Sequence, residues 1–146
     1  MWQHQVRRVT LGELMTYSPG GVLLLERFTI PIEVARSVVD FFGDNNPIHH
    51  DTERAKDLGF KDVVVPKSAI FGIITGLVGS YFPVGSTLRD ITLKFRRQIL
   101  VSREFRIRID LVDFERGRIT SCRVAVYDPE RREVFILGRL AVLLPA

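Results

Sequence analysis

The sequence of 146 residues predicts an α+β fold, in which an antiparallel β-sheet packs against a long buried helix. Three observations predict it: the apolar helical segment Ser68–Tyr81, four strand-like runs from Leu88 onward, and an earlier strand at Leu23–Thr29. The chain contains no internal repeat, low-complexity tract or linker. We therefore expect a single domain over residues 1–146.

The first elements are a strand and an amphipathic helix. Leu23–Thr29 is rich in β-forming residues, and Pro31 follows it at a position where a helix can begin. Apolar residues then recur at helical spacing, at Ala35, Val38, Val39 and Phe42. We expect this helix to end at Gly43. A shorter helix over Glu53–Leu58 should follow, ended by Gly59.

The long helix over Ser68–Tyr81 has two distinct stripes. One stripe is aliphatic, with Ile70, Ile73, Ile74 and Leu77, and the other carries Gly72, Thr75, Gly76 and Gly79. Each glycine destabilises a helix by about 1 kcal/mol relative to alanine, so a stripe of glycines indicates a structural or functional requirement for small residues there. We expect the glycines to allow close packing on the sheet, which is compatible with a ligand passing the end of the helix.

From Leu88 onward the pattern changes to strands. Four runs are expected: Leu88–Arg97, Glu104–Phe114, Arg118–Tyr127 and Glu133–Leu144. In the second run, Phe105, Ile107, Ile109 and Leu111 alternate with Arg106, Arg108 and Asp110. Such period-two alternation is typical of an antiparallel sheet with one face in water.

Composition narrows the class of protein. An apolar fraction of 46% with 26% charged residues is ordinary for a globular protein. The single Cys122 excludes an internal disulfide, the stretch Met1–Arg8 lacks the order of a secretory signal, and the most apolar window, Ala69–Val78, is shorter than the roughly 20 residues that span a bilayer. We therefore expect a cytoplasmic protein.

The net charge of +4 predicts attraction of anions. Nucleic acid is one candidate, but no nucleic-acid-binding motif accompanies the basic residues. They form either solvated strand faces or a rim for a phosphorylated small molecule, such as coenzyme A, or for an acidic carrier protein. These residues are Arg89, Lys94, Arg96, Arg97, Arg103, Arg106, Arg108, Arg116, Arg118, Arg123, Arg131, Arg132 and Arg139.

The residues most indicative of chemistry are the run Gly43-Asp44-Asn45-Asn46-Pro47-Ile48-His49-His50-Asp51. The Asn-Asn-Pro core favours a turn, which brings Asp44 and His49 together as two proton-handling groups. The competing interpretations are a turn carboxylate and a surface imidazole. We expect His50 and Asp51 to serve the turn and the next helix. We expect no metal site, because adjacent histidines in an extended segment point opposite ways.

This run resembles the active-site signature of the MaoC-like (R)-specific enoyl-CoA hydratases, which have the hot-dog fold. The resemblance covers about residues 23–143, including the strand that contains Leu93–Arg97. It implies an antiparallel sheet wrapped around the central helix, a homodimer or higher homo-oligomer, an acyl-CoA or acyl carrier protein thioester as ligand, and no cofactor.

The resemblance also implies roles for individual residues. Asp44 and His49 correspond to the residues that bind the catalytic water, and Asn46 supports them. Substrate binding is assigned to Pro47, Gly72 and Arg97.

The chain departs from the family at the start of the central helix. Many relatives read Ala-His-Gly-Met there, whereas this chain reads Val65-Pro66-Lys67-Ser68. The backbone N–H groups of Lys67 and Ser68 remain available as oxyanion donors, although the Lys67 side chain either obstructs the site or pairs with a phosphate or carboxylate. A second departure, Ser102-Arg103 in place of Gly-Asp, is expected to affect only a loop.

The expected activity is that of a hydro-lyase interconverting trans-2-enoyl and (R)-3-hydroxyacyl thioesters. Alternatives are a 3-hydroxyacyl-carrier-protein dehydratase of fatty-acid or polyketide synthesis, and a non-catalytic acyl-thioester-binding or partner subunit. A thioesterase of this fold is disfavoured, because Lys67–Tyr81 contains no Asp or Glu.

Overall fold

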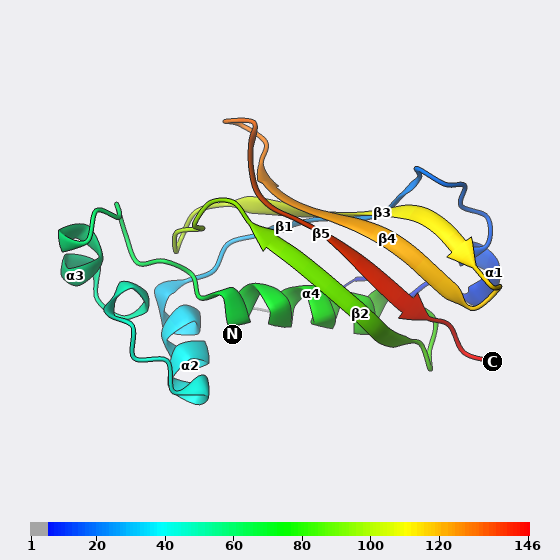
Figure 1. Cartoon of the computed structure of the whole chain (residues 1–146), viewed down its shortest axis with the longest axis horizontal. Helices are drawn as coiled ribbons and strands as arrows, with labels where there is room; N and C mark the ends of the chain where they lie inside the picture. The colour runs from blue at the N-terminus through cyan, green and yellow to red at the C-terminus, as the bar shows by residue number, and fades with distance from the viewer. Residues whose placement is uncertain (1–5) are drawn as a thin grey trace.

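The computed structural model describes residues 6–146 and shows a five-stranded antiparallel sheet with one long helix along one face (Figure 1). Residues 1–5, which contribute to the export prediction, lie outside that range. The helices are α1 (Leu11–Leu14), α2 (Ile32–Phe42), η1 (a 3-10 turn, Pro47–His49), α3 (Thr52–Asp57) and α4 (Lys67–Tyr81). The strands are β1 (Val22–Phe28), β2 (Thr87–Phe95), β3 (Phe105–Glu115), β4 (Ile119–Asp128) and β5 (Glu133–Leu143).

The predicted α+β architecture is confirmed, and the predicted strands and helices begin and end within two residues of their expected bounds. The short α1 was not among the predicted elements. Its signal is a capping box, in which the Thr10 hydroxyl accepts from the Glu13 N–H and the Glu13 carboxylate accepts from the Thr10 N–H.

The sheet has the strand order β1-β3-β4-β5-β2, with every neighbouring pair antiparallel. In β3, Phe105, Ile107, Ile109 and Leu111 are buried, as the alternation predicted. Their neighbours Arg106, Arg108 and Asp110 lie on the opposite face. No helix within residues 6–146 is long and apolar enough to cross a membrane.

The core is built around α4. Its buried residues are Ala69, Ile70, Ile74, Leu77, Val78 and Tyr81. The expectation that its glycines pack closely on the sheet is wrong. A Cβ atom added to Gly72, Gly76 or Gly79 would meet no heavy atom within 4 Å, so the glycine stripe faces open space. Helical periodicity explains this, because the fully buried Ile70 and Ile74 occupy the side of α4 that the sheet covers.

Helix α2 ends as predicted and sets the position of the motif loop. Gly43 is left-handed, with φ of 71°, and the Asp44 N–H donates to the Val39 carbonyl at 2.8 Å. Ala35 and Val39 are buried, but Phe42 is 65% exposed. The expected apolar stripe therefore faces the core only in part, and its last member lies toward an open cavity.

A short extended segment ties the motif loop to the connection that leads into α4. The Val64 N–H donates to the Ile48 carbonyl at 2.8 Å, and the Val65 N–H donates to the Ile99 carbonyl at 2.7 Å. The Val101 N–H donates back to Val63 at 3.0 Å. Residues 48–49 are thus held against residues 63–65, a few residues before α4 begins.

Candidate active site

His49 is the buried centre of the candidate site. Its side chain is 11% exposed, and Nδ1 lies 2.7 Å from the Val64 carbonyl oxygen. A carbonyl only accepts hydrogen bonds, so Nδ1 carries the hydrogen, and Nε2 of the neutral ring presents a lone pair. The backbone of Val64 thereby selects the tautomer in which Nε2 is a proton acceptor.

Asp44 faces this lone pair. Its Oδ2 lies 3.7 Å from His49 Nε2, while Oδ1 accepts the Asn46 N–H at 2.9 Å. The distance between Oδ2 and Nε2 exceeds that of a direct hydrogen bond. When the imidazole is neutral both atoms are acceptors, so one water molecule can donate a hydrogen to each. The turn role of Asp44 and its pairing with His49 therefore occur together, through different oxygens.

The remaining polar residues of the loop hold its shape. Asn46 caps η1 by accepting the Ile48 N–H at 3.3 Å, and Asp51 caps α3 by accepting the Glu53 N–H at 2.9 Å. His50 Nε2 lies 2.7 Å from the Asp44 carbonyl oxygen. The structural roles expected for His50 and Asp51 are confirmed.

The two histidine rings bind different carbonyls and do not converge on one point. Among residues 6–146, no group of three or more His, Cys, Asp or Glu side chains is placed to hold a metal ion. The thiol of Cys122 is buried, and burial raises its pKa to about 12. A nucleophilic thiolate at neutral pH is therefore excluded.

The N-terminal end of α4 offers unused donors. Pro66 precedes the helix without a side-chain cap, and the N–H groups of Lys67 and Ser68 make no hydrogen bond to another described residue. These groups lie at the positive end of the helix dipole. The Lys67 ammonium lies 4.9 Å from the centre of the Phe95 ring, so its side chain turns toward β2.

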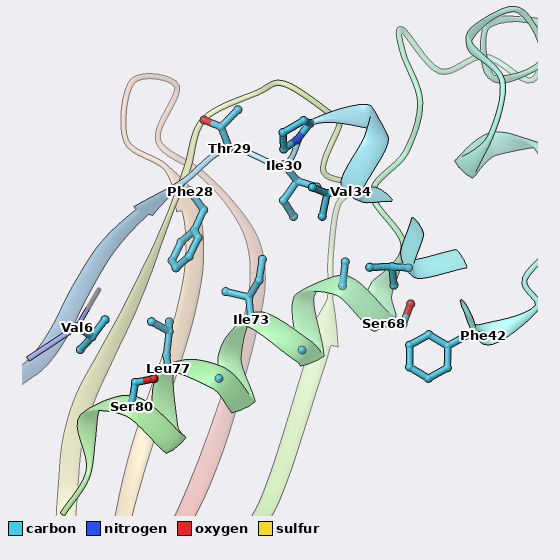
Figure 2. A pocket seen from close by; sticks show the side chains of 15 residues that line it. Val6, Phe28, Thr29, Ile30, Val34, Phe42, Ser68, Ile73, Leu77 and Ser80 are labelled. Carbon is cyan, nitrogen blue, oxygen red and sulfur yellow. The ribbon is translucent and has the colours of Figure 1, made fainter. Parts of the chain in front are cut away.

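A cavity of about 430 Å³ lies between α4, α2 and the end of β1 (Figure 2). Its walls are mainly apolar, with Phe28, Ile30, Val34, Val38, Ile73 and Leu77 among the lining residues. Ser68 and Ser80 line it near opposite ends of α4, and their separation of 12 positions corresponds to about 18 Å of helix. Gly72 and Gly76 leave the room that side chains would fill.

The structure brings only some of the predicted residues together. Gly72 and Ser68 line the cavity, but Asp44 and His49 do not. Phe42, two residues before Asp44, does line it, so the loop begins where the cavity wall ends.

Two predicted substrate-binding residues lie elsewhere. Pro47 is exposed at the first position of η1, and the Arg97 side chain is 62% exposed with Nη1 3.5 Å from Glu133. Val64, which binds His49, and Phe42, which lines the cavity, were not among the predicted site residues. Helical spacing alone could not distinguish a core side chain from one that lines a cavity.

Comparison with curated proteins gives partial matches. No protein-family model matches the chain. It is 30% identical over 104 residues to a UPF0336 protein of Thermobifida fusca, covering 67% of this chain and 62% of that protein. It is 33% identical over 61 residues to the mitochondrial 3-hydroxyacyl-acyl-carrier-protein dehydratase FERN of Solanum lycopersicum, covering 42% of this chain and 36% of that protein. The chain thus spans less than two thirds of the length of each of these relatives.

Solved structures match over nearly the whole chain. The (R)-hydratase of A. caviae, involved in PHA biosynthesis, superposes with a TM-score of 0.79 at 17% identity, covering 89% of this chain and 98% of that one. The R-hydratase PhaJ1 of Pseudomonas aeruginosa gives 0.80 at 16% identity, covering 90% and 84%. A MaoC-like dehydratase of Rhodospirillum rubrum gives 0.73 at 17% identity, covering 94% and 98%.

The fold and the site together define a hot-dog protein with a histidine–carboxylate pair near the start of its central helix. More particularly, the fold is that of the MaoC-like dehydratases and (R)-hydratases. The resemblance predicted from the motif is confirmed at the level of the fold.

Proposed function

We propose that this protein is a hydro-lyase that interconverts trans-2-enoyl and (R)-3-hydroxyacyl thioesters. The observation that carries the proposal is the pairing of His49 Nε2 with Asp44 Oδ2 at 3.7 Å, with Nδ1 held by the Val64 carbonyl. Such a pair can hold and deprotonate one water molecule. The apolar cavity beside the loop supplies room for an acyl chain.

The proposed reaction begins with a water molecule that donates one hydrogen to Asp44 Oδ2 and the other to His49 Nε2. The water oxygen bonds to C3 of the enoyl group as His49 Nε2 takes its proton. The electrons of the C2–C3 double bond move toward the thioester oxygen, giving an enolate. His49 then returns the proton to C2, so that one water has been added across the double bond. Dehydration is the same path reversed.

The enolate oxygen requires hydrogen-bond donors, and we assign these to the Lys67 and Ser68 N–H groups. Preorganised donors aimed at a developing negative charge are a large source of rate enhancement. The position of Lys67 Nζ over the Phe95 ring supports the assignment, because it draws that side chain toward β2 and leaves the backbone donor accessible. Lysine in place of glycine is then compatible with the reaction.

We assign the acyl chain to the cavity along α4, where Gly72 and Gly76 leave space. Asn46 acts through the loop, since its side chain caps η1 and its N–H is bound by Asp44. Pro47 and Arg97 are exposed and outside the cavity, so we assign them to the part of the thioester that remains in solvent.

A second candidate is the dehydrating reaction on a carrier-linked 3-hydroxyacyl thioester. The identity shared with the tomato protein, a 3-hydroxyacyl-acyl-carrier-protein dehydratase by name, favours it. The same residues catalyse both directions. An acidic carrier substrate would make turnover far more sensitive to salt than a coenzyme A substrate.

We also propose a homo-oligomer of single-domain subunits, assembled through a sheet edge. Within residues 6–146, β1 and β2 each have a neighbouring strand on one side only, and Ile91, Leu93 and Phe95 of β2 are half-buried. An unpaired edge favours pairing with another chain. A partner subunit in a hetero-complex is the alternative, since two M. tuberculosis neighbours are the ChsH1–ChsH2 and HadBC complexes. The sole, buried thiol of Cys122 suits a cytoplasmic location.

The test is hydration of crotonyl-CoA by the purified protein, followed through the loss of enoyl-thioester absorbance. Asp44→Asn and His49→Ala should each lower kcat by roughly 10²–10⁴-fold, since each removes a group that handles the proton. Asp40→Asn is the matched control, because Asp40 is a 72% exposed carboxylate near the same loop.

Circular dichroism should show all three variants folded. Unchanged hydration by both Asp44→Asn and His49→Ala would contradict the proposal. Tight acyl-CoA binding by the wild-type protein without any hydration would instead indicate a non-catalytic subunit.

A further inference from the structure

A basic groove of about 270 Å³ lies on the face of the sheet opposite α4. It is lined from β2, β4 and β5, and none of its lining residues is acidic. Its charged residues are Lys94, Arg96, Arg123 and Arg139, all of them exposed. Arg123 alternates with the buried Cys122 and Val124 along β4, which places it on the outer face.

The four cations of the groove have no close carboxylate partner within the described part of the chain, although Arg139 also lines a neighbouring pocket with Asp90 and Glu115. Arg123 and Arg139 are direct cross-strand partners, an arrangement of like charges that destabilises a sheet. None of the four forms an ion pair with another residue in 6–146. By contrast, Arg103 binds Asp128 at 2.8 Å and Arg108 binds Asp110 at 2.7 Å. The groove therefore concentrates positive charge that an anionic ligand would balance.

The groove adjoins the candidate active site around the end of one strand. Lys94 and Arg96 flank Phe95, and alternation along the strand turns Phe95 toward the helix face and its neighbours toward the groove. The Phe95 ring contacts Lys67 at the first turn of α4. Strand β2 ends at Phe95, and Figure 1 shows this end next to the start of α4. The flexible arm of a ligand bound at the first turn of α4 can therefore reach the groove by passing the end of β2.

We propose that this groove binds the nucleotide phosphates of a coenzyme A thioester. The inference rests on the proposed function and identifies the handle of its substrate. Coenzyme A carries a diphosphate and a ribose phosphate, separated from the thioester by the pantetheine arm. Arginine and lysine side chains bind such groups through charge-assisted hydrogen bonds. The small volume of the groove suits phosphate groups better than the flat surface of a folded partner.

The experiment compares two substrates that share one thioester, crotonyl-CoA and crotonyl-pantetheine, which lacks the nucleotide. The double variant Arg123→Gln with Arg139→Gln should raise the KM for crotonyl-CoA about tenfold or more, because two charge-assisted contacts are lost. Its kcat should not change, and neither should its kcat/KM for crotonyl-pantetheine. Arg89→Gln is the control, because Arg89 is exposed near the other end of β2 and does not line the groove.

The variant should fold normally, because it removes two like charges that face each other; thermal unfolding checks this. An unchanged KM for crotonyl-CoA would overturn the proposal. So would a loss confined to a carrier-protein-linked substrate, which would assign the groove to an acidic protein.

If neither thioester is hydrated, the proposed function fails, and the groove is tested separately by calorimetry with adenosine 3′,5′-bisphosphate. Binding that is lost in the double variant and is competed by coenzyme A supports the groove. No binding, or binding that coenzyme A does not displace, overturns it.

Discussion

The two sides of α4 differ in how closely they are packed. On the sheet side, Ile70 and Ile74 are at most 1% exposed and belong to the hydrophobic core. On the other side, Gly72, Gly76 and Gly79 would each accept a Cβ without contacting any atom within 4 Å. One side is filled by large side chains, and the other is left open by the absence of side chains.

The two sides of α4 therefore contribute differently to the stability of the fold and to the space in the cavity. Burial of aliphatic side chains on the sheet side stabilises the fold. The glycines on the open side lower helix stability and gain no packing in return. Two of the three line the cavity, and under the proposed function the space they leave holds the acyl chain. Substitutions on the two sides should therefore separate stability from substrate use.

The largest expected effect on stability is on the sheet side. Ile74→Ala should lower the free energy of unfolding by about 2–5 kcal/mol, because it leaves a cavity in a fully buried part of the core. Urea denaturation followed by circular dichroism measures the change. A loss below about 1 kcal/mol would show that the sheet side is less closely packed than its burial indicates.

Gly76→Leu on the open side should leave stability unchanged or raised, since the new side chain meets no neighbour at Cβ and leucine favours helix. It should reduce the cavity and lower kcat/KM for trans-2-decenoyl-CoA relative to crotonyl-CoA by about tenfold, the scale of a few lost apolar contacts. Thr75→Leu is the matched control, because Thr75 is exposed on α4 outside the cavity. An equal loss for both substrates would argue that the acyl chain lies elsewhere.

The smallest expected effect is at Gly79, which is exposed and does not line the cavity. Gly79→Ala should raise the free energy of unfolding by about 1 kcal/mol through helix propensity alone. Activity on short and long substrates should be unchanged. A destabilised variant would reveal close contact at this position with another copy of the chain.

Much of the fold was predictable because its signals are local. Gly43 ends α2 in a left-handed conformation, Asp51 caps α3, and the alternation around Phe105 and Ile107 marks a half-buried strand. Each depends on residues a few positions away. For the same reason the Asn-Pro turn predicted that Asp44 and His49 approach each other, which the 3.7 Å distance confirms.

Other parts of the site depend on residues distant in the sequence. The tautomer of His49 follows from the carbonyl of Val64, 15 residues away, which no spacing rule connects to it. The direction of Lys67 depends on Phe95 in β2, and the pairing of Arg123 with Arg139 depends on the register of β4 and β5.

The sequence by itself therefore determined the longer helices, the strands and the turn that brings Asp44 to His49, because periodicity, caps and turn residues act over a few positions. Only the tertiary structure decided that the glycine side of α4 faces open space and not the sheet, where the cavity lies, and which cations line one groove. These features arise where segments far apart in the chain meet. Their positions follow from packing and strand register, which local preferences do not specify.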